Sequence, residues 1–149
     1  MFRKFWLPIL VVAGMLVYIH LVTNSAFWLM FDLPALLIML VLAPLPSCLI
    51  HGAGNIGTAF KAPFAANPSR RDLQTAIAFF QALCGSVFGF AACAAIISLV
   101  SMMRNLEDPT QVGPNLAIAM LSLFYAAVIH VLLVLPFIIN ARKRLAELD

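Results

Sequence analysis

Residues 90–145 read FAACAAIISLVSMMRNLEDPTQVGPNLAIAMLSLFYAAVIHVLLVLPFIINARKRL, and this stretch decides the fold. Two long apolar runs flank a short polar hinge at 104–114. Each run is long enough to cross a bilayer as a helix, because about 20 apolar residues span the hydrocarbon core. Asp108-Pro109 and Gly113-Pro114 in the hinge are turn or helix-boundary signals. The stretch therefore predicts a helical hairpin in a membrane, and its small residues allow close helix packing.

The composition of the whole chain indicates the same class. Of 149 residues, 64% are hydrophobic and only 10% are charged, and the mean hydropathy is +1.04. Soluble domains carry about 25% charged residues, so a soluble globular domain is excluded. The net charge of +3 does not indicate nucleic-acid binding, because the basic residues fall at the ends of the predicted helices, where they meet lipid headgroups.

The apolar runs predict an all-α integral membrane protein with both termini in the cytoplasm. One membrane domain, 1–149, contains four transmembrane helices at approximately 5–23, 33–50, 74–103 and 115–140, a cytoplasmic loop at 51–72 and a periplasmic hinge at 104–114. The basic start and apolar core of the first helix are also typical of a signal peptide. However, its core is long and Asn24 stands where cleavage needs a small residue, so we expect an uncleaved helix.

Prolines and an aspartate mark the second helix. Asp32 and Pro34 suit its first turn, because Asp favours a helix N-terminus and Pro is tolerated there. Pro44 and Pro46 predict a kink further along.

The polar stretch 51–72 resembles a dinucleotide fingerprint only superficially. Its glycines at 52, 54 and 57 lack the preceding strand that such a motif needs. A short interfacial helix at 56–64, with Lys61 among headgroups, fits better. Ser69 or Asp72 is suited to cap the next helix.

The distribution of Lys and Arg predicts the topology. Four crossings with cytoplasmic termini place one basic residue, Arg104, outside. The eight on the cytoplasmic side are Arg3, Lys4, Lys61, Arg70, Arg71, Arg142, Lys143 and Arg144. This asymmetry satisfies the positive-inside rule.

Two blocks of the chain resemble a known family. The words NLEDPTQVGP at 105–114, Phe124-Tyr125 and Leu135-Pro136, with Ala117 and Ala119, resemble the last two helices of the MotA branch of the MotA/TolQ/ExbB proton-channel family. FDLPALLI at 31–38 resembles the start of that family's second helix. Together the blocks cover about half the chain. The segment 51–72 is too short for the large cytoplasmic domain of flagellar stators, so torque on a flagellar rotor is not expected.

The resemblance implies a bacterial inner-membrane subunit that assembles as a pentamer around a single-span partner of the MotB/TolR/ExbD type. That partner supplies the membrane aspartate for proton transport. By position, the family's Gly-Thr of the third helix falls on Ala94-Ala95 and its hydroxyl pair of the fourth helix on Ser122-Leu123, so two threonine hydroxyls are missing. The small residues of the third helix offer close-packing surface, and we expect Ala91 and Ala95 to lie at contacts needed for assembly.

Two sets of residues follow as site candidates. The ion-path or pore-lining candidates are Ala94, Ala95, Ser98, Ser122, Leu123, Tyr125 and His130. The structural hinge candidates are Asp32, Pro34, Asp108, Pro109, Gly113, Pro114 and Pro136.

His130 stands alone as an ionisable residue near the middle of a predicted membrane helix. It suits a proton relay, a hydrogen bond to a neighbour or subunit packing, and a structural role is favoured. The cysteines Cys48, Cys84 and Cys93 lack metal-like spacing and behave as small hydrophobes. We expect no metal, no cofactor and no enzymatic activity.

Three functions remain in competition. The first is the channel or scaffold subunit, and the second is a non-conducting helical bundle. The third, a small four-helix exporter, is less favoured because such exporters need a carboxylate in the first helix, and residues 5–22 have none.

Overall fold

The computed structural model describes residues 6–23 and 32–148. In order, its helices are α1 (Trp6–Thr23), α2 (Leu33–Val41), α3 (Leu45–Lys61), the 3₁₀-helix η3 (Ala62–Phe64), α4 (Arg70–Arg104), α5 (Pro109–Ile129), the π-helix η4 (His130–Val134) and α6 (Leu135–Ala146). That part of the chain contains no strand, so the all-α expectation is confirmed. The predicted start of the first helix at residue 5, the basic pair Arg3-Lys4 and the segment 24–31 lie outside the described residues.

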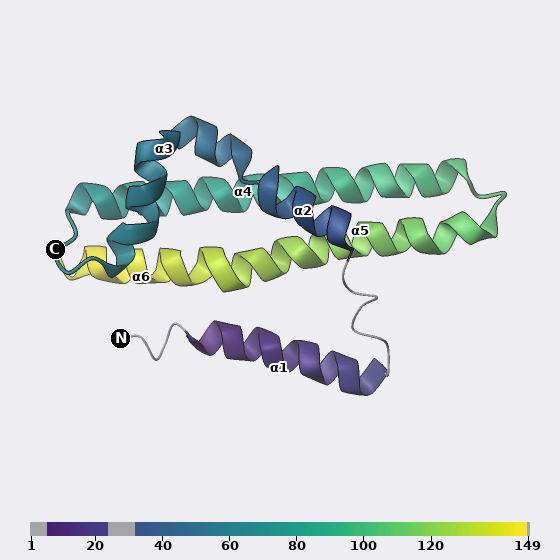
Figure 1. Ribbon diagram of the computed structural model, residues 1–149, viewed down its shortest axis with the longest axis horizontal. Coiled ribbons are helices and arrows are strands. Elements are labelled where there is room, and N and C mark those ends of the chain that lie inside the picture. Colours follow the sequence, from purple (N-terminus) through teal and green to yellow (C-terminus); the bar gives the residue numbers. More distant parts are fainter. Residues whose placement is uncertain (1–5, 24–31, 149) are drawn as a thin grey trace.

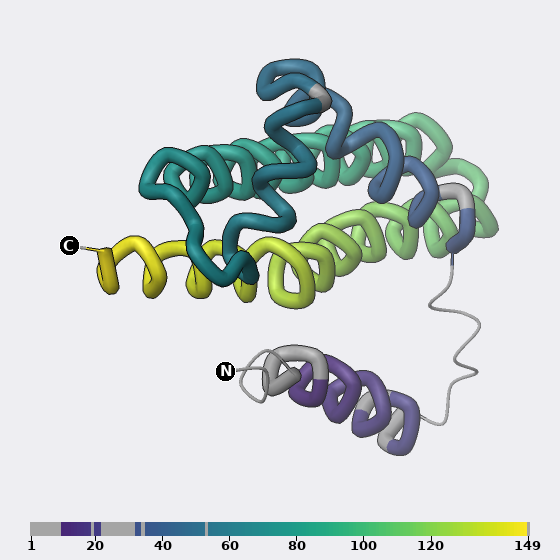
Figure 2. The backbone as a smooth tube through the Cα atoms, turned by 60° about the vertical axis from the view of Figure 1, so that its left-hand side comes forward, coloured from purple at the N-terminus to yellow at the C-terminus, as the bar shows by residue number. Residues whose placement is uncertain are grey.

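The core of the fold is a long antiparallel hairpin (Figures 1 and 2). One arm is α4, and the other is the continuous run of α5, η4 and α6. The 35 residues of α4 extend over about 52 Å at 1.5 Å per residue. This exceeds the roughly 30 Å thickness of the hydrocarbon core of a bilayer.

The turn of the hairpin is shorter than the sequence predicts. Only residues 105–108 lie outside helices, and Gly113 and Pro114 lie within α5. The helix begins early because Asp108 caps it, accepting a hydrogen bond from the backbone N–H of Thr110. Pro109 has no N–H to satisfy and fits the first turn.

The helices α2 and α3 lie across the hairpin (Figure 1). The kink expected from Pro44 and Pro46 occurs as a turn at 42–44. A second break falls at Gly52, where φ is +74°, a backbone conformation that favours glycine. The helix then resumes and runs to Lys61, so much of the stretch expected as a loop is helical. Of the glycines of the superficial fingerprint, Gly52 thus stands at the break and Gly54 and Gly57 stand in the helix that follows, without the strand that nucleotide binding requires.

Aromatic side chains fill the core between α3, α4 and α6. Phe80 is fully buried and contacts Phe60 and Phe137, with ring centroids 5.2 and 4.7 Å away. Phe60 and Phe137 also meet each other, 5.3 Å apart. This cluster holds the far end of α3 against both arms of the hairpin.

The π-helix η4 interrupts the second arm directly before Pro136. The N–H of Leu135 donates to the carbonyl of His130, five residues back. Pro136 has no N–H and would leave an α-helical carbonyl without its donor, so the widened turn falls where the regular pattern cannot continue. Helix α1 packs against this segment.

Three helical segments of the described chain are long and apolar enough to cross a membrane: Ala35–Gly52, Arg70–Arg104 and Pro109–Ala146. Many of their large apolar side chains stay exposed, among them Ile97 at 69% and Leu49 at 79%. Soluble monomers rarely expose such continuous apolar surface. The exposed faces are therefore those expected to meet lipid or other subunits.

Candidate functional site

Four of the ion-path candidates are buried, two on each of α4 and α5. Ala95 and Ser98 come from α4, and Ser122 and Tyr125 come from α5. The hydroxyl of Ser98 donates to the carbonyl of Asn115 across the two helices, 2.7 Å away. These candidates therefore lie inside the subunit, and Ser98 lies at the packed interface of its hairpin.

The two buried serine hydroxyls already have partners. Ser98 donates to Asn115, and Ser122 donates to the carbonyl of Ile118 on its own helix at 2.8 Å. Each hydroxyl keeps acceptor capacity, so it can still receive a hydrogen bond from a water molecule.

The remaining small or apolar candidates lie elsewhere. Leu123 is 46% exposed and turns away from the interface, while Ala94 is half-buried. The structure therefore divides the matched pairs Ala94-Ala95 and Ser122-Leu123, placing Ala95 and Ser122 inside and Leu123 on the outer surface. The seven candidates do not share one face.

His130 lies at the start of the π-helix and bridges to α4. Its Nδ1 is 3.3 Å from the Sγ of Cys84, and its ring meets the edge of Phe88 at a centroid distance of 5.7 Å. The imidazole is half-buried and has a hydrogen-bonding neighbour, as a structural role requires. π-Turns within helices are frequent at functional sites.

Sequence reasoning missed both the π-turn and the partner of His130. The signal for the turn was Pro136 inside an otherwise helical run. Cys84 was taken only as a small hydrophobe, and its distance in sequence from His130 gave no sign of the contact.

The hinge candidate Asp32 meets an ion-path candidate. Its backbone N–H donates to the hydroxyl oxygen of Tyr125 at 2.8 Å, which ties the start of α2 to α5. Residues 31–38 and the pair Phe124-Tyr125 belong to the two blocks on which the family resemblance rests. The fold brings these blocks together although 93 residues separate the bonded pair.

A further polar contact joins the middle of the molecule. The hydroxyls of Ser47 on α3 and Ser86 on α4 lie 3.0 Å apart, and Ser86 also donates to the carbonyl of Leu83. Ser47 is 1% exposed. Polar side chains thus fix how α3 sits on the hairpin, where nonspecific apolar packing would leave its position less defined.

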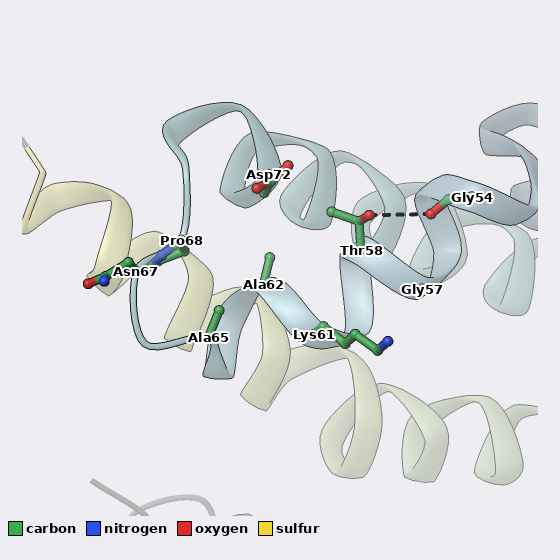
Figure 3. A pocket seen from close by; sticks show the side chains of 9 residues that line it. All are labelled: Gly54, Gly57, Thr58, Lys61, Ala62, Ala65, Asn67, Pro68 and Asp72. Atoms are coloured by element: carbon green, nitrogen blue, oxygen red, sulfur yellow. Dashed lines mark hydrogen bonds between the residues drawn. The ribbon is translucent and has the colours of Figure 1, made fainter.

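A pocket of about 300 Å³ opens where α3 ends and α4 begins (Figure 3). Its lining includes Lys61 and Asp72 together with several small residues. Within the described residues, no group of three or more His, Cys, Asp or Glu side chains is arranged to hold a metal ion.

The comparisons with known proteins give a distant similarity to two curated proteins. The chain is 27% identical over 77 residues to Motility protein A of Aquifex aeolicus (strain VF5), covering 52% of this chain and 30% of that protein. It is 27% identical over 86 residues to the Chemotaxis protein PomA of Vibrio alginolyticus, covering 58% of this chain and 33% of that protein. The chain thus spans about a third of the length of these curated relatives. No protein-family model and no solved structure matches it.

Proposed function

We propose that this chain is a MotA-like channel or scaffold subunit of the bacterial inner membrane, with no enzymatic activity. The observation that carries the proposal is the similarity to Motility protein A and PomA over about half the chain. The subunit encloses the transmembrane helix of a single-span partner of the MotB/TolR/ExbD type and couples proton flow to work on that partner.

The proposed topology has four crossings and cytoplasmic termini. The three long apolar segments supply three crossings, and α1 supplies the fourth. The turn at Asn105–Asp108 then lies outside, and the joint between α3 and α4 lies in the cytoplasm. The eight-to-one distribution of basic residues supports this orientation.

The proposed assembly is a cyclic pentamer in which α4 meets neighbouring subunits. One face of α4 carries small side chains that its own subunit leaves exposed: Gly85, Gly89, Ala92 and Cys93. A Cβ added at either glycine would meet no atom within 4 Å, so the subunit itself does not require glycine there. Small residues are the ones that let membrane helices approach closely.

Proton transfer in this proposal depends on the partner. Between residues 33 and 71, and again between 73 and 106, the chain has no Asp or Glu, so its second and third crossings supply no central carboxylate. We expect little or no flux through the chain alone in proteoliposomes under an imposed pH gradient. Flux should appear when a partner with a membrane aspartate is co-reconstituted.

The exposed position of Leu123 provides a variant for this experiment, and its neighbour Ser122 provides the control. Leu123→Thr places a hydroxyl on the exposed face of α5, and we expect it to increase flux with the partner present. Ser122→Ala removes a hydroxyl that is buried within the subunit and serves as the matched control with little effect. Robust flux through the parent chain alone, abolished by His130→Ala but not by Ser122→Ala, would contradict the proposal and make His130 the proton carrier.

The second candidate is a non-conducting structural bundle. The hydrogen bonds of Ser98 and Ser122 to carbonyls favour it, because both hydroxyls already have a partner and the bond of Ser98 joins the two arms of the hairpin. Absence of flux in every combination of chain, partner and variant would select this candidate.

A further inference from the structure

Small residues form part of the wall of the pocket between α3 and α4. Gly54 and Gly57 line it from α3, and a Cβ added at either would meet no atom within 4 Å. Ala62 and Ala65 continue the lining through η3. The space next to the two glycines is therefore open to an added side-chain atom.

Two residues of opposite charge line this space from different elements. Asp72 stands on the α4 side, and Lys61 on the side formed by α3 and η3 (Figure 3). In the described part of the chain neither forms a salt bridge, whereas Lys143 pairs with Glu147 at 4.0 Å. The carboxylate and the ammonium group therefore remain available to a ligand that carries both charges.

The wall of the pocket is held from outside by α6. The side-chain amide of Asn140 donates to the carbonyl of Pro63 at 2.7 Å, and Arg144 donates to the carbonyl of Ala65. These bonds hold the segment that carries Ala62 and Ala65 against α6.

The position of the pocket in the proposed topology indicates the class of ligand that it binds. It lies beside the cytoplasmic end of α4, where Arg70 and Arg71 stand at the level of the headgroups. We propose that it binds a phosphoethanolamine group, that of a membrane lipid. Lys61 attracts the phosphate as a point charge, and Asp72 accepts hydrogen bonds from the ammonium group. This inference depends on the proposed membrane topology and not on ion conduction.

The test measures retention of added lipids by the purified chain in native mass spectrometry. Phosphatidylethanolamine, phosphatidylcholine and phosphatidylglycerol with the same acyl chains are compared. We expect preference for phosphatidylethanolamine, because the methylated amine of phosphatidylcholine has no N–H and phosphatidylglycerol has no amine. Asp72→Asn should remove that preference, with a loss of about tenfold in apparent affinity, and Asp72→Glu should keep it.

Two further variants separate binding from folding. Gly57→Leu should fill the pocket and abolish lipid preference while the melting temperature stays equal or rises, because leucine has the better helix propensity. If its melting temperature falls, Gly54→Leu serves the same purpose. Lys61→Gln should weaken the binding of all three phospholipids, whereas the control Lys143→Gln should not.

The proposal is overturned if Asp72→Asn keeps the parent's preference or if a well-folded Gly57→Leu chain binds like the parent. It is also overturned if soluble phosphoethanolamine displaces the lipid at equal concentration, since the ligand would then be a free metabolite. These outcomes do not depend on proton flux, so the channel proposal and this one can fail separately.

Discussion

At the residue scale, Asp108 controls the turn between the two arms of the hairpin. The hydroxyl of Thr110 and then its backbone N–H donate to the carboxylate, and these bonds lower the pKa of Asp108 below its usual value. A carboxyl whose pKa is lowered by folding stabilises the fold above the pKa of the unfolded chain. That contribution is lost as the pH falls through the lowered, folded value.

Asp108→Asn should remove this acid dependence while keeping a capping side chain, since Asn is as good an N-cap as Asp. The measurement follows the Thr110 amide by NMR in micelles from about pH 6 to about pH 2. In the parent, the transition should have a midpoint below about 3.9, the ordinary value for Asp. In the variant we expect no such transition. A parent midpoint at or above the ordinary value would show that the Thr110 bonds do not persist in solution.

At the element scale, the aromatic cluster holds α3 and α6 on α4, and Phe80 is its fully buried member. Phe80→Ala should lower the free energy of unfolding by about 3–5 kcal/mol, because it removes buried surface and leaves a cavity. Thermal unfolding in detergent, followed by circular dichroism, measures the loss.

Phe90→Ala on the same helix is the matched control, because Phe90 is 37% exposed. It should change stability much less. Equal effects of the two substitutions would mean that the cluster does not hold the elements together.

Elements were predictable from sequence where hydrophobicity and length decide them. The 90–145 stretch indicated the hairpin. Of the two cap candidates, Ser69 and Asp72, the structure has Ser69 in that role, since its hydroxyl accepts from the N–H of Asp72. A short helix was expected at 56–64, and the structure is helical there, with α3 running to Lys61 and η3 following it. The continuity of this helix with the residues before 56 was not evident, because Gly54 and Gly57 weaken the helical signal. The π-turn was not predicted, because it arises where Pro136 falls within a helix that packs against its neighbours, and a local sequence pattern does not show that packing.

At the scale of the whole molecule, the sequence indicated which residue types make up the candidate site. It did not indicate toward which side of its helix each side chain points. Sequence position alone placed Ala95 and Leu123 on one path. The structure buries Ala95 and exposes Leu123, because the face that a helix residue occupies depends on where the neighbouring helices lie. Likewise, Ala91 was expected at an assembly contact, yet Ala91 and Ala95 are buried at 0% and 7% exposure within the subunit. Their close packing is internal, and bulk added there acts first on folding.

Assembly can therefore be tested with neighbouring residues that point in different directions. Ala91 is buried within the chain, whereas Ala92 is exposed on the small-residue face of α4. Ala91→Leu should overpack the subunit and lower its free energy of unfolding by about 1–3 kcal/mol. Ala92→Leu should keep the helix content of the parent but reduce the native mass from oligomer towards monomer, because it separates helices that meet between subunits. Native mass spectrometry and circular dichroism of the same detergent samples distinguish the two effects. If Ala92→Leu assembles like the parent, this face of α4 meets lipid, and the proposed pentamer must use another surface.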